Sequence, residues 1–161
     1  MTVIADTSPL NYAVAIDESH VLFQLYGRIV VPQAVSSEIR HEGAPFELRK
    51  WVDDNQNRIE VRSVEVPDDP RLDFLDAGER EAIVLAQQTP GSLLIIDDKD
   101  GRMEASLRGI TITGLLGVIR DAAVRKYLDF DTALQKLKET DFRLDPEVEA
   151  LVRRQYLEQL S

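Results

Sequence analysis

Hydrophobic positions along this chain follow two patterns. Short continuous apolar runs are typical of buried strands, whereas apolar positions three and four residues apart indicate amphipathic helices. Residues 58–66 alternate apolar and polar side chains, as a half-exposed edge strand does. We therefore expect strands at residues 2–6, 28–32, 58–66, 93–96 and 109–113.

Helical spacing fills the intervals between these strands. Ser8 is a suitable N-cap for a helix that begins at Pro9, and Asp76 with Glu79 has the spacing of a capping box. Alternating strands and helices predict an α/β fold: a three-layer α/β/α arrangement around a central, mostly parallel five-stranded sheet. The helices are expected at residues 9–16, 18–26, 32–40, 44–54, 77–88, 99–108, 114–126, 130–139 and 146–159.

The chain has 161 residues and shows no repeat, low-complexity tract or dividing linker. This predicts one domain over residues 1–161, with the helices at about 130–160 packing on it or on a partner. Apolar side chains form a stripe along the last helix, and internal packing is favoured because amphipathic helices usually cover their own core. The stripe consists of Val148, Leu151, Val152, Tyr156 and Leu160.

The amino-acid composition limits the kinds of functional site that this chain can form. The net charge of −10 argues against broad non-specific binding to nucleic acid, although it allows a local basic rim. The absence of cysteine excludes disulfides and thiolate metal sites, and two histidines make zinc sites and His-based triads poor candidates. No apolar run is long enough for a membrane span or a signal peptide, so we expect a cytoplasmic location without membrane contact.

Carboxylates follow two of the predicted strands. Asp6 ends the first strand, and Asp97 and Asp98 end the fourth. In parallel sheets, ligands bind beyond the carboxyl ends of the strands, where the strand order reverses. Asp98 is placed to cap the next helix, which leaves Asp97 unexplained by capping, and Asp100 is expected to face water.

Two more acids lie in helices that leave neighbouring strands. Glu38 borders a buried stripe, where a solvated side chain is the commoner outcome. Glu79 shares its helical face with inward-pointing apolar residues, although the capping role also explains it, and Glu81 faces elsewhere and is expected to be solvated. Such acids, if they converge, would raise one another's pKa or require a cation, and hard oxygen ligands suit Mg²⁺ or Mn²⁺.

Five stretches, taken in order, resemble the PIN domain family, the nuclease fold found in ribonuclease toxins of prokaryotic toxin–antitoxin pairs. The resemblance runs from Thr2 to about Lys126. The sequence departs from common toxin patterns in having Glu79 as the third acid and "DD" followed by "GR" in the fourth region. The stretches are "VIADTSPL", "VVPQAVSSEI", "LDAGEREAIVLA", "LLIIDDKDGR" and "GITITGLLGVI".

The resemblance implies metal-dependent hydrolysis of RNA, with Mg²⁺ or Mn²⁺ as cofactor. It also implies a homodimer and a small antitoxin-like protein partner. Glu38 would position or deprotonate the attacking water. The implied catalytic residues are Asp6, Glu38, Glu79 and Asp98, the implied metal ligands are Asp6, Glu79, Asp97 and Asp98, and the implied substrate-binding residues are Ser8, Lys99 and Arg102.

A second interpretation is a non-catalytic PIN-like binding module that acts through a protein partner or a dimer. Phosphotransfer folds fit less well. Haloacid-dehalogenase phosphatases need a second aspartate where this chain has Ser8, and response-regulator receivers need paired acids after the first strand rather than the fourth.

Overall fold

Five parallel strands form the centre of the protein. The computed structural model describes all residues, 1–161. The strand order is β3-β2-β1-β4-β5, and every neighbouring pair is parallel, which confirms the predicted α/β class. From β1 the chain continues towards one edge of the sheet, through β2 to β3, and from β4 it continues towards the other edge, to β5. The strand order therefore reverses between β1 and β4. The strands are β1 (Val3–Ala5), β2 (Ile29–Pro32), β3 (Ile59–Arg62), β4 (Leu93–Ile95) and β5 (Thr111–Thr113).

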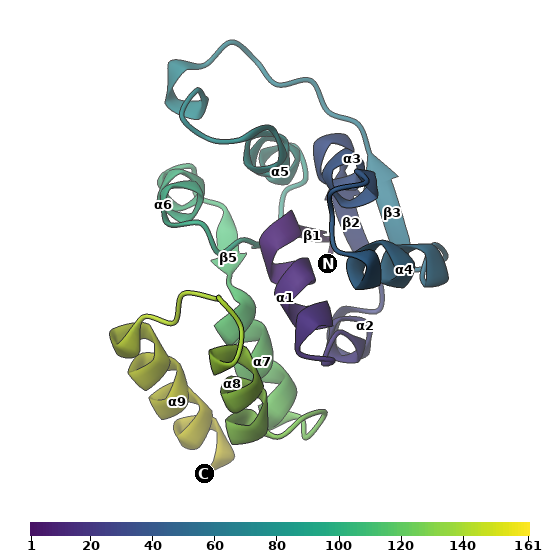
Figure 1. The fold of residues 1–161 in the computed structure, drawn as a ribbon. Coiled ribbons are helices and arrows are strands. Elements are labelled where there is room, and N and C mark those ends of the chain that lie inside the picture. Colours follow the sequence, from purple (N-terminus) through teal and green to yellow (C-terminus); the bar gives the residue numbers. More distant parts are fainter.

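Helices cover both faces of this sheet (Figure 1). Alternate strand residues point to opposite faces, so Ile4 and Leu94 join one apolar cluster with α5 and α6, whereas Val3 and Ile95 join another with α1, α2 and α7. This confirms the three-layer arrangement. The helices are α1 (Thr7–Ala15), α2 (His20–Tyr26), α3 (Gln33–Arg40), α4 (Phe46–Asp54), α5 (Ala77–Gln87), α6 (Lys99–Leu107), α7 (Leu115–Val124), α8 (Phe130–Lys138) and α9 (Pro146–Leu160).

The last two helices pack against α7, away from the sheet (Figure 1). Val152 is buried in the larger apolar cluster, and the ring of Tyr156 stacks on Phe130 with a centroid distance of 4.6 Å. The other members of the predicted stripe, Val148, Leu151 and Leu160, are exposed. None of the helices has both the length and the apolar character that crossing a membrane requires.

Several predicted boundaries differ from the structure by a few residues, and two of these differences are informative. Strand β3 ends at Arg62 rather than at residue 66, because β2 is its only neighbour and their pairing stops where Pro32 meets Arg62. Helix α1 begins at Thr7 and has Asp6, not Ser8, at its N-cap position, so the expected capping role of Ser8 is wrong. Pro9 fits inside the first turn because the amides there have no partner within the helix.

Candidate active site at the carboxyl ends of β1 and β4

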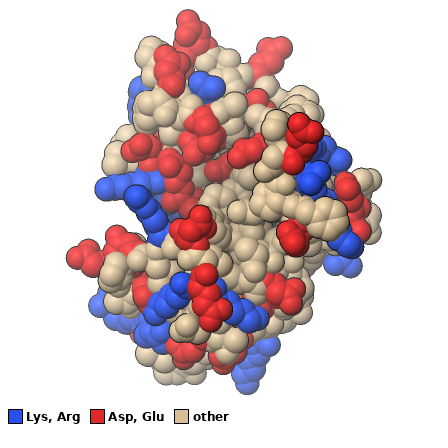
Figure 2. All heavy atoms as spheres, in the orientation of Figure 1, with Lys and Arg blue, Asp and Glu red and all other residues tan.

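An open cavity of about 320 Å³ lies where the strand order reverses. It brings together every acid that the sequence predicted as catalytic or metal-binding. Figure 2 shows acidic side chains over the middle of the face that Figure 1 presents, between groups of basic ones. The cavity is lined by Asp6, Thr7, Ser8, Tyr12, Glu38, Asp76, Glu79, Asp97, Asp98, Asp141, Phe142 and Arg143.

Asp6 lies deepest in this group of acids. Its backbone amide donates to the carbonyl of Ile95 at 3.0 Å, which fixes the residue between β1 and β4. Its side chain caps no helix and the residue is only 5 % exposed. Burial raises the pKa of Asp6 to about 8; the amide of Thr7 opposes this rise, and repulsion from Asp76, Glu79 and Glu38 adds to it.

Glu79 has a structural role and a place in the cavity at once. Its amide donates to Oδ1 of Asp76 at 2.8 Å, and its Oε2 accepts from the Asp76 amide at 3.1 Å, which confirms the capping box. The pKa of Glu79 is raised to about 7, chiefly by burial; the hydrogen bond from the Asp76 amide opposes the rise, and the carboxylates of Asp76 and Asp98 add to it. The cap therefore holds the Glu79 carboxylate in place beside the other acids.

Gly78 allows the start of α5 to lie against Asp6. A Cβ at this position would be 3.2 Å from Cγ2 of Val35 and 3.3 Å from Oδ1 of Asp6. Both distances are shorter than ordinary van der Waals contact. The small residue in "DAGE" thus brings the capping box of α5 close to the acid that ends β1.

Asp97 caps a helix that sequence reasoning did not connect with it. Its Oδ1 accepts from the Leu115 amide, at the start of α7, at 2.9 Å. The expectation that capping leaves Asp97 unexplained is therefore wrong. Its Oδ2 is buried and has no hydrogen-bond partner, and burial raises the pKa of the carboxyl, opposed by the Leu115 amide and Arg102.

Asp98 caps the helix that follows it, as the sequence predicted. Its Oδ2 accepts from the Gly101 amide at 2.8 Å and so caps α6, while the side chain also lines the cavity. Asp100 is exposed, as expected. Lys99 and Arg102 do not line the cavity. Nη1 of Arg102 instead donates to the carbonyl of Ile96 at 2.8 Å.

Glu38 reaches the cavity from α3. The hydroxyl of Thr7 donates to its Oε2 at 2.9 Å, which links the start of α1 to α3 and leaves Oε1 without a protein partner. The side chain is exposed, as local sequence suggested, but this hydrogen bond orients it. Ser8 lies on the same wall.

Glu81 differs from its predicted role. It is half-buried, and its Oε1 accepts from the Ala34 amide in the first turn of α3 at 3.0 Å. The expectation of a solvated Glu81 is wrong, because α5 packs beside α3 and delivers this carboxylate to a helix end that has no local cap.

Sequence reasoning missed two groups of cavity residues. Asp76 was interpreted only as a cap, although its place before Glu79 was a usable signal. The loop between α8 and α9 contributes Asp141, Phe142 and Arg143, and no local pattern indicated that it returns to the site. The hydroxyl of Tyr12 donates to Oδ1 of Asp141 at 2.7 Å.

The residues present fit a divalent cation. The donors are carboxylate oxygens, which Mg²⁺ and Mn²⁺ prefer, and the unpartnered Oδ2 of Asp97 is an acceptor that burial has left unsatisfied. Burial, and to a lesser extent repulsion between the acids, raises the pKa values of Asp6 and Glu79, and a bound cation would favour the charged carboxylates against both effects. No three of the side chains stand close enough to enclose an ion without local adjustment.

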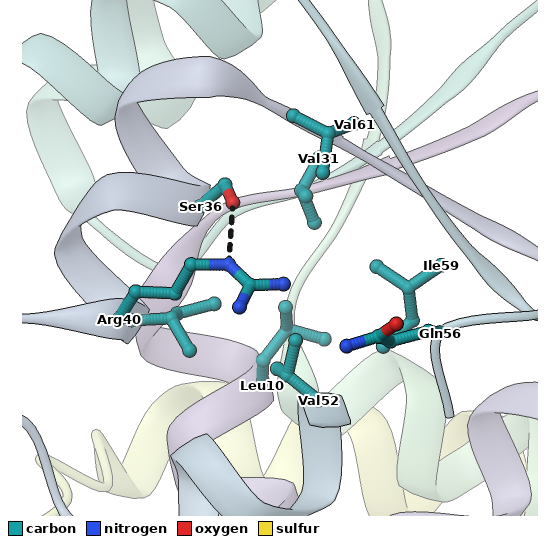
Figure 3. A pocket seen from close by; sticks show the side chains of 9 residues that line it. Leu10, Val31, Ser36, Arg40, Val52, Gln56, Ile59 and Val61 are labelled. Atoms are coloured by element: carbon teal, nitrogen blue, oxygen red, sulfur yellow. Dashed lines mark hydrogen bonds between the residues drawn. The ribbon is translucent and has the colours of Figure 1, made fainter. Parts of the chain in front are cut away.

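A second, much smaller pocket is apolar. Its volume of about 20 Å³ is of the order that holds one water molecule. Figure 3 shows its wall of aliphatic side chains, with the hydrogen bond from Nε of Arg40 to the Ser36 hydroxyl at 3.4 Å at its edge. Arg40 also pairs with Asp53, so this pocket offers no chemistry comparable to that of the acidic cavity.

Fold and site together define an α/β protein with an acidic cavity at the switch point of a parallel sheet. The chain belongs to the PIN domain family: a family model described as a PIN domain matches residues 2–158. PIN domains are usually nucleases and generally use divalent metal ions.

One solved structure is similar in fold, a PilT N-terminus domain protein from the hyperthermophilic archaeon Sulfolobus solfataricus P2. It is 18 % identical in sequence, with a TM-score of 0.49 over 90 % of this chain and 100 % of that chain. Comparison with curated proteins gave no match.

Proposed function

We propose that this protein is an endoribonuclease that depends on a divalent metal ion. The observation that carries the proposal is the convergence on one cavity of Asp6, Glu79, Asp97 and Asp98, which come from three separate segments. A fold that buries Asp6 and raises its pKa to about 8 gives up stability at neutral pH. A functional role for these acids accounts for the stability that is lost.

The same four acids would hold Mg²⁺ or Mn²⁺. When bound there, such an ion lowers the pKa of water and neutralises charge on phosphodiester oxygens. The capping box fixes Glu79, and the Leu115 amide fixes one oxygen of Asp97, so the protein holds these ligands before an ion arrives.

Glu38 is the proposed general base. Thr7 occupies Oε2, so Oε1 is the atom placed to accept a proton from water. Glu38 is exposed and open to solvent, whereas Asp6 is buried. The two acids thus differ in environment as their two proposed roles require.

A groove beside the cavity favours the interpretation that the substrate is a polymer. It has a volume of about 740 Å³ and shares Thr7, Ser8, Tyr12 and Glu38 with the acidic cavity. Its other lining residues include the polar side chains of Asn11, Ser37 and His41. Such a surface suits an unpaired RNA strand, whose base edges are free to form hydrogen bonds.

The test is cleavage of a 5′-labelled single-stranded RNA with Mg²⁺ or Mn²⁺. Asp6→Asn should abolish cleavage and leave the thermal unfolding transition in place. Asp100→Asn is the matched control, because it removes the same charge from an exposed position outside the cavity. Undiminished cleavage by Asp6→Asn would contradict the site assignment.

Failure of the wild type to cleave any of a panel of RNAs, together with no thermal shift by Mn²⁺, would favour the non-catalytic binding module. The homodimer and the small antitoxin-like partner remain proposals that rest on the family resemblance.

A further inference from the structure

The acidic cavity contains a single basic side chain. Seven of its lining residues are acids, and Arg143 is the only cation. Arg143 is exposed and forms no ion pair or side-chain hydrogen bond, although seven acids line the same cavity. An arginine beside so many acids that pairs with none of them is free to bind an incoming anion.

The loop that carries Arg143 is anchored to α1. Tyr12 donates to Oδ1 of Asp141 at 2.7 Å, and its ring meets Phe142 edge-on at a centroid distance of 5.1 Å. Within the loop, the Phe142 amide donates to the Thr140 hydroxyl at 3.1 Å. These contacts fix the residues just before Arg143, so its backbone is held at the rim of the cavity.

Other basic residues near the site either contact groups of the protein or do not line the cavity. Arg102 donates to the Ile96 carbonyl, and Arg40 contacts Ser36 and Asp53. Lys99 is exposed and does not line the cavity. Arg143 is therefore the one side chain of the cavity wall that can offer positive charge and paired N–H donors to a phosphate.

We propose that Arg143 binds a backbone phosphate of the RNA strand next to the bond that is cleaved, and that Tyr12 is a positioning residue for it. The inference rests on the proposed ribonuclease function and assigns the substrate contact to the loop between α8 and α9. A phosphate that approaches seven carboxylates needs a fixed counter-charge, and this loop supplies it.

The experiment compares steady-state RNA cleavage by the wild type, Arg143→Ala, Arg143→Lys and Arg154→Ala. Loss of a charged hydrogen bond to phosphate should raise KM about tenfold to a hundredfold in Arg143→Ala, with a smaller change in kcat. Arg143→Lys should recover part of the loss, because it keeps the charge and loses the paired donors. Arg154 is an exposed arginine of α9 outside the cavity, so its alanine variant should match the wild type.

Salt dependence separates a phosphate contact from a structural role. In a plot of log affinity against log salt concentration, Arg143→Ala should have a slope smaller by about 0.7, the value for one phosphate contact on a single strand. Affinity is measured in the Asp6→Asn background to prevent cleavage. Tyr12→Phe should raise KM in the same direction by a smaller factor, with the thermal midpoint changed by no more than a few degrees.

An active wild type whose Arg143→Ala variant keeps the same KM and salt slope would overturn the inference and leave the proposed function intact. A wild type that neither cleaves nor binds RNA would overturn both. A lower thermal midpoint in Arg143→Ala with an unchanged salt slope would show that the residue is only structural.

Discussion

The carboxylate of Asp97 accepts a hydrogen bond from the backbone amide of Leu115, 18 residues further along the chain, at 2.9 Å. This contact joins the end of β4 to the start of α7. Oδ1 of Asp97 takes part in this structural contact, whereas Oδ2 is buried without a hydrogen-bond partner. Substitution of Asp97 would therefore disturb folding and any metal binding together, so indirect variants are more informative.

Gly114→Ala is one such variant. The added Cβ would lie 2.5 Å from Oδ1 of Asp97 and 2.9 Å from Nη1 of Arg102, so these side chains must move. We expect a loss of about 1–3 kcal/mol in the free energy of unfolding and a smaller thermal shift on addition of Mn²⁺. Urea unfolding and thermal shift assays measure the two effects. Gly43→Ala, whose Cβ meets only the His41 ring, is the control.

Stability without metal should fall as the pH rises from about 5 to 8. The pKa values of Asp6 and Glu79 are raised to about 8 and about 7, so the folded state keeps protons that the unfolded state releases. The groups that face Asp6 are Asp76, Glu79 and Glu38, and all are acidic. Mn²⁺ should therefore raise the thermal midpoint more at pH 8 than at pH 5.5.

Asp6→Asn serves as the reference for this pH dependence. The variant removes the most strongly shifted group, so its thermal midpoint should fall less than that of the wild type between pH 5 and 8. Identical slopes in the two proteins would mean that Asp6 does not hold its proton in the folded state.

Glu81→Ala should destabilise the protein. The variant removes the acceptor for the Ala34 amide in the first turn of α3, and loss of a helix cap costs about 0.5–2 kcal/mol. Because α3 also carries Glu38, RNA cleavage should decrease as well. Glu42→Ala, at an exposed position beyond the end of α3, should change neither quantity. Equal unfolding free energies for wild type and Glu81→Ala would rule out the capping role.

Glu104→Gln should lower the free energy of unfolding by more than Glu81→Ala does. The buried Glu104 carboxylate accepts from Arg71 at 2.8 Å and from Arg108 at 2.9 Å, and Arg108 also contacts Asp69 at 2.7 Å. Removing one member of a buried ion pair costs about 3–5 kcal/mol, which chemical denaturation would detect. Lys50→Ala breaks only an exposed pair with Asp54 and should leave the free energy of unfolding unchanged within error.

The hydrophobic pattern along the chain was enough to predict the layers of the fold. The continuous apolar run at residues 93–96 supplies β4, and a sheet covered on both faces buries Leu94, Ile95 and Ile96. Apolar runs of this kind located Asp6, Asp97 and Asp98, since an acid that directly follows a buried parallel strand lies at the carboxyl edge of the sheet. The Asp76–Glu79 capping box was also readable, because both of its hydrogen bonds join residues three positions apart.

The hydrogen-bond partners of these acids, in contrast, depend on contacts between distant parts of the chain. Asp97 caps α7 and Glu81 caps α3 through contacts that join residues 18 and 47 positions apart, and no local spacing encodes them. The loop that carries Arg143 lies at the cavity because the Tyr12 hydroxyl donates a hydrogen bond to Asp141, 129 residues further along the chain. Local periodicity fixes which residues are buried on each element, whereas the partners of a side chain depend on how distant elements pack, and that arrangement is a property of the whole chain.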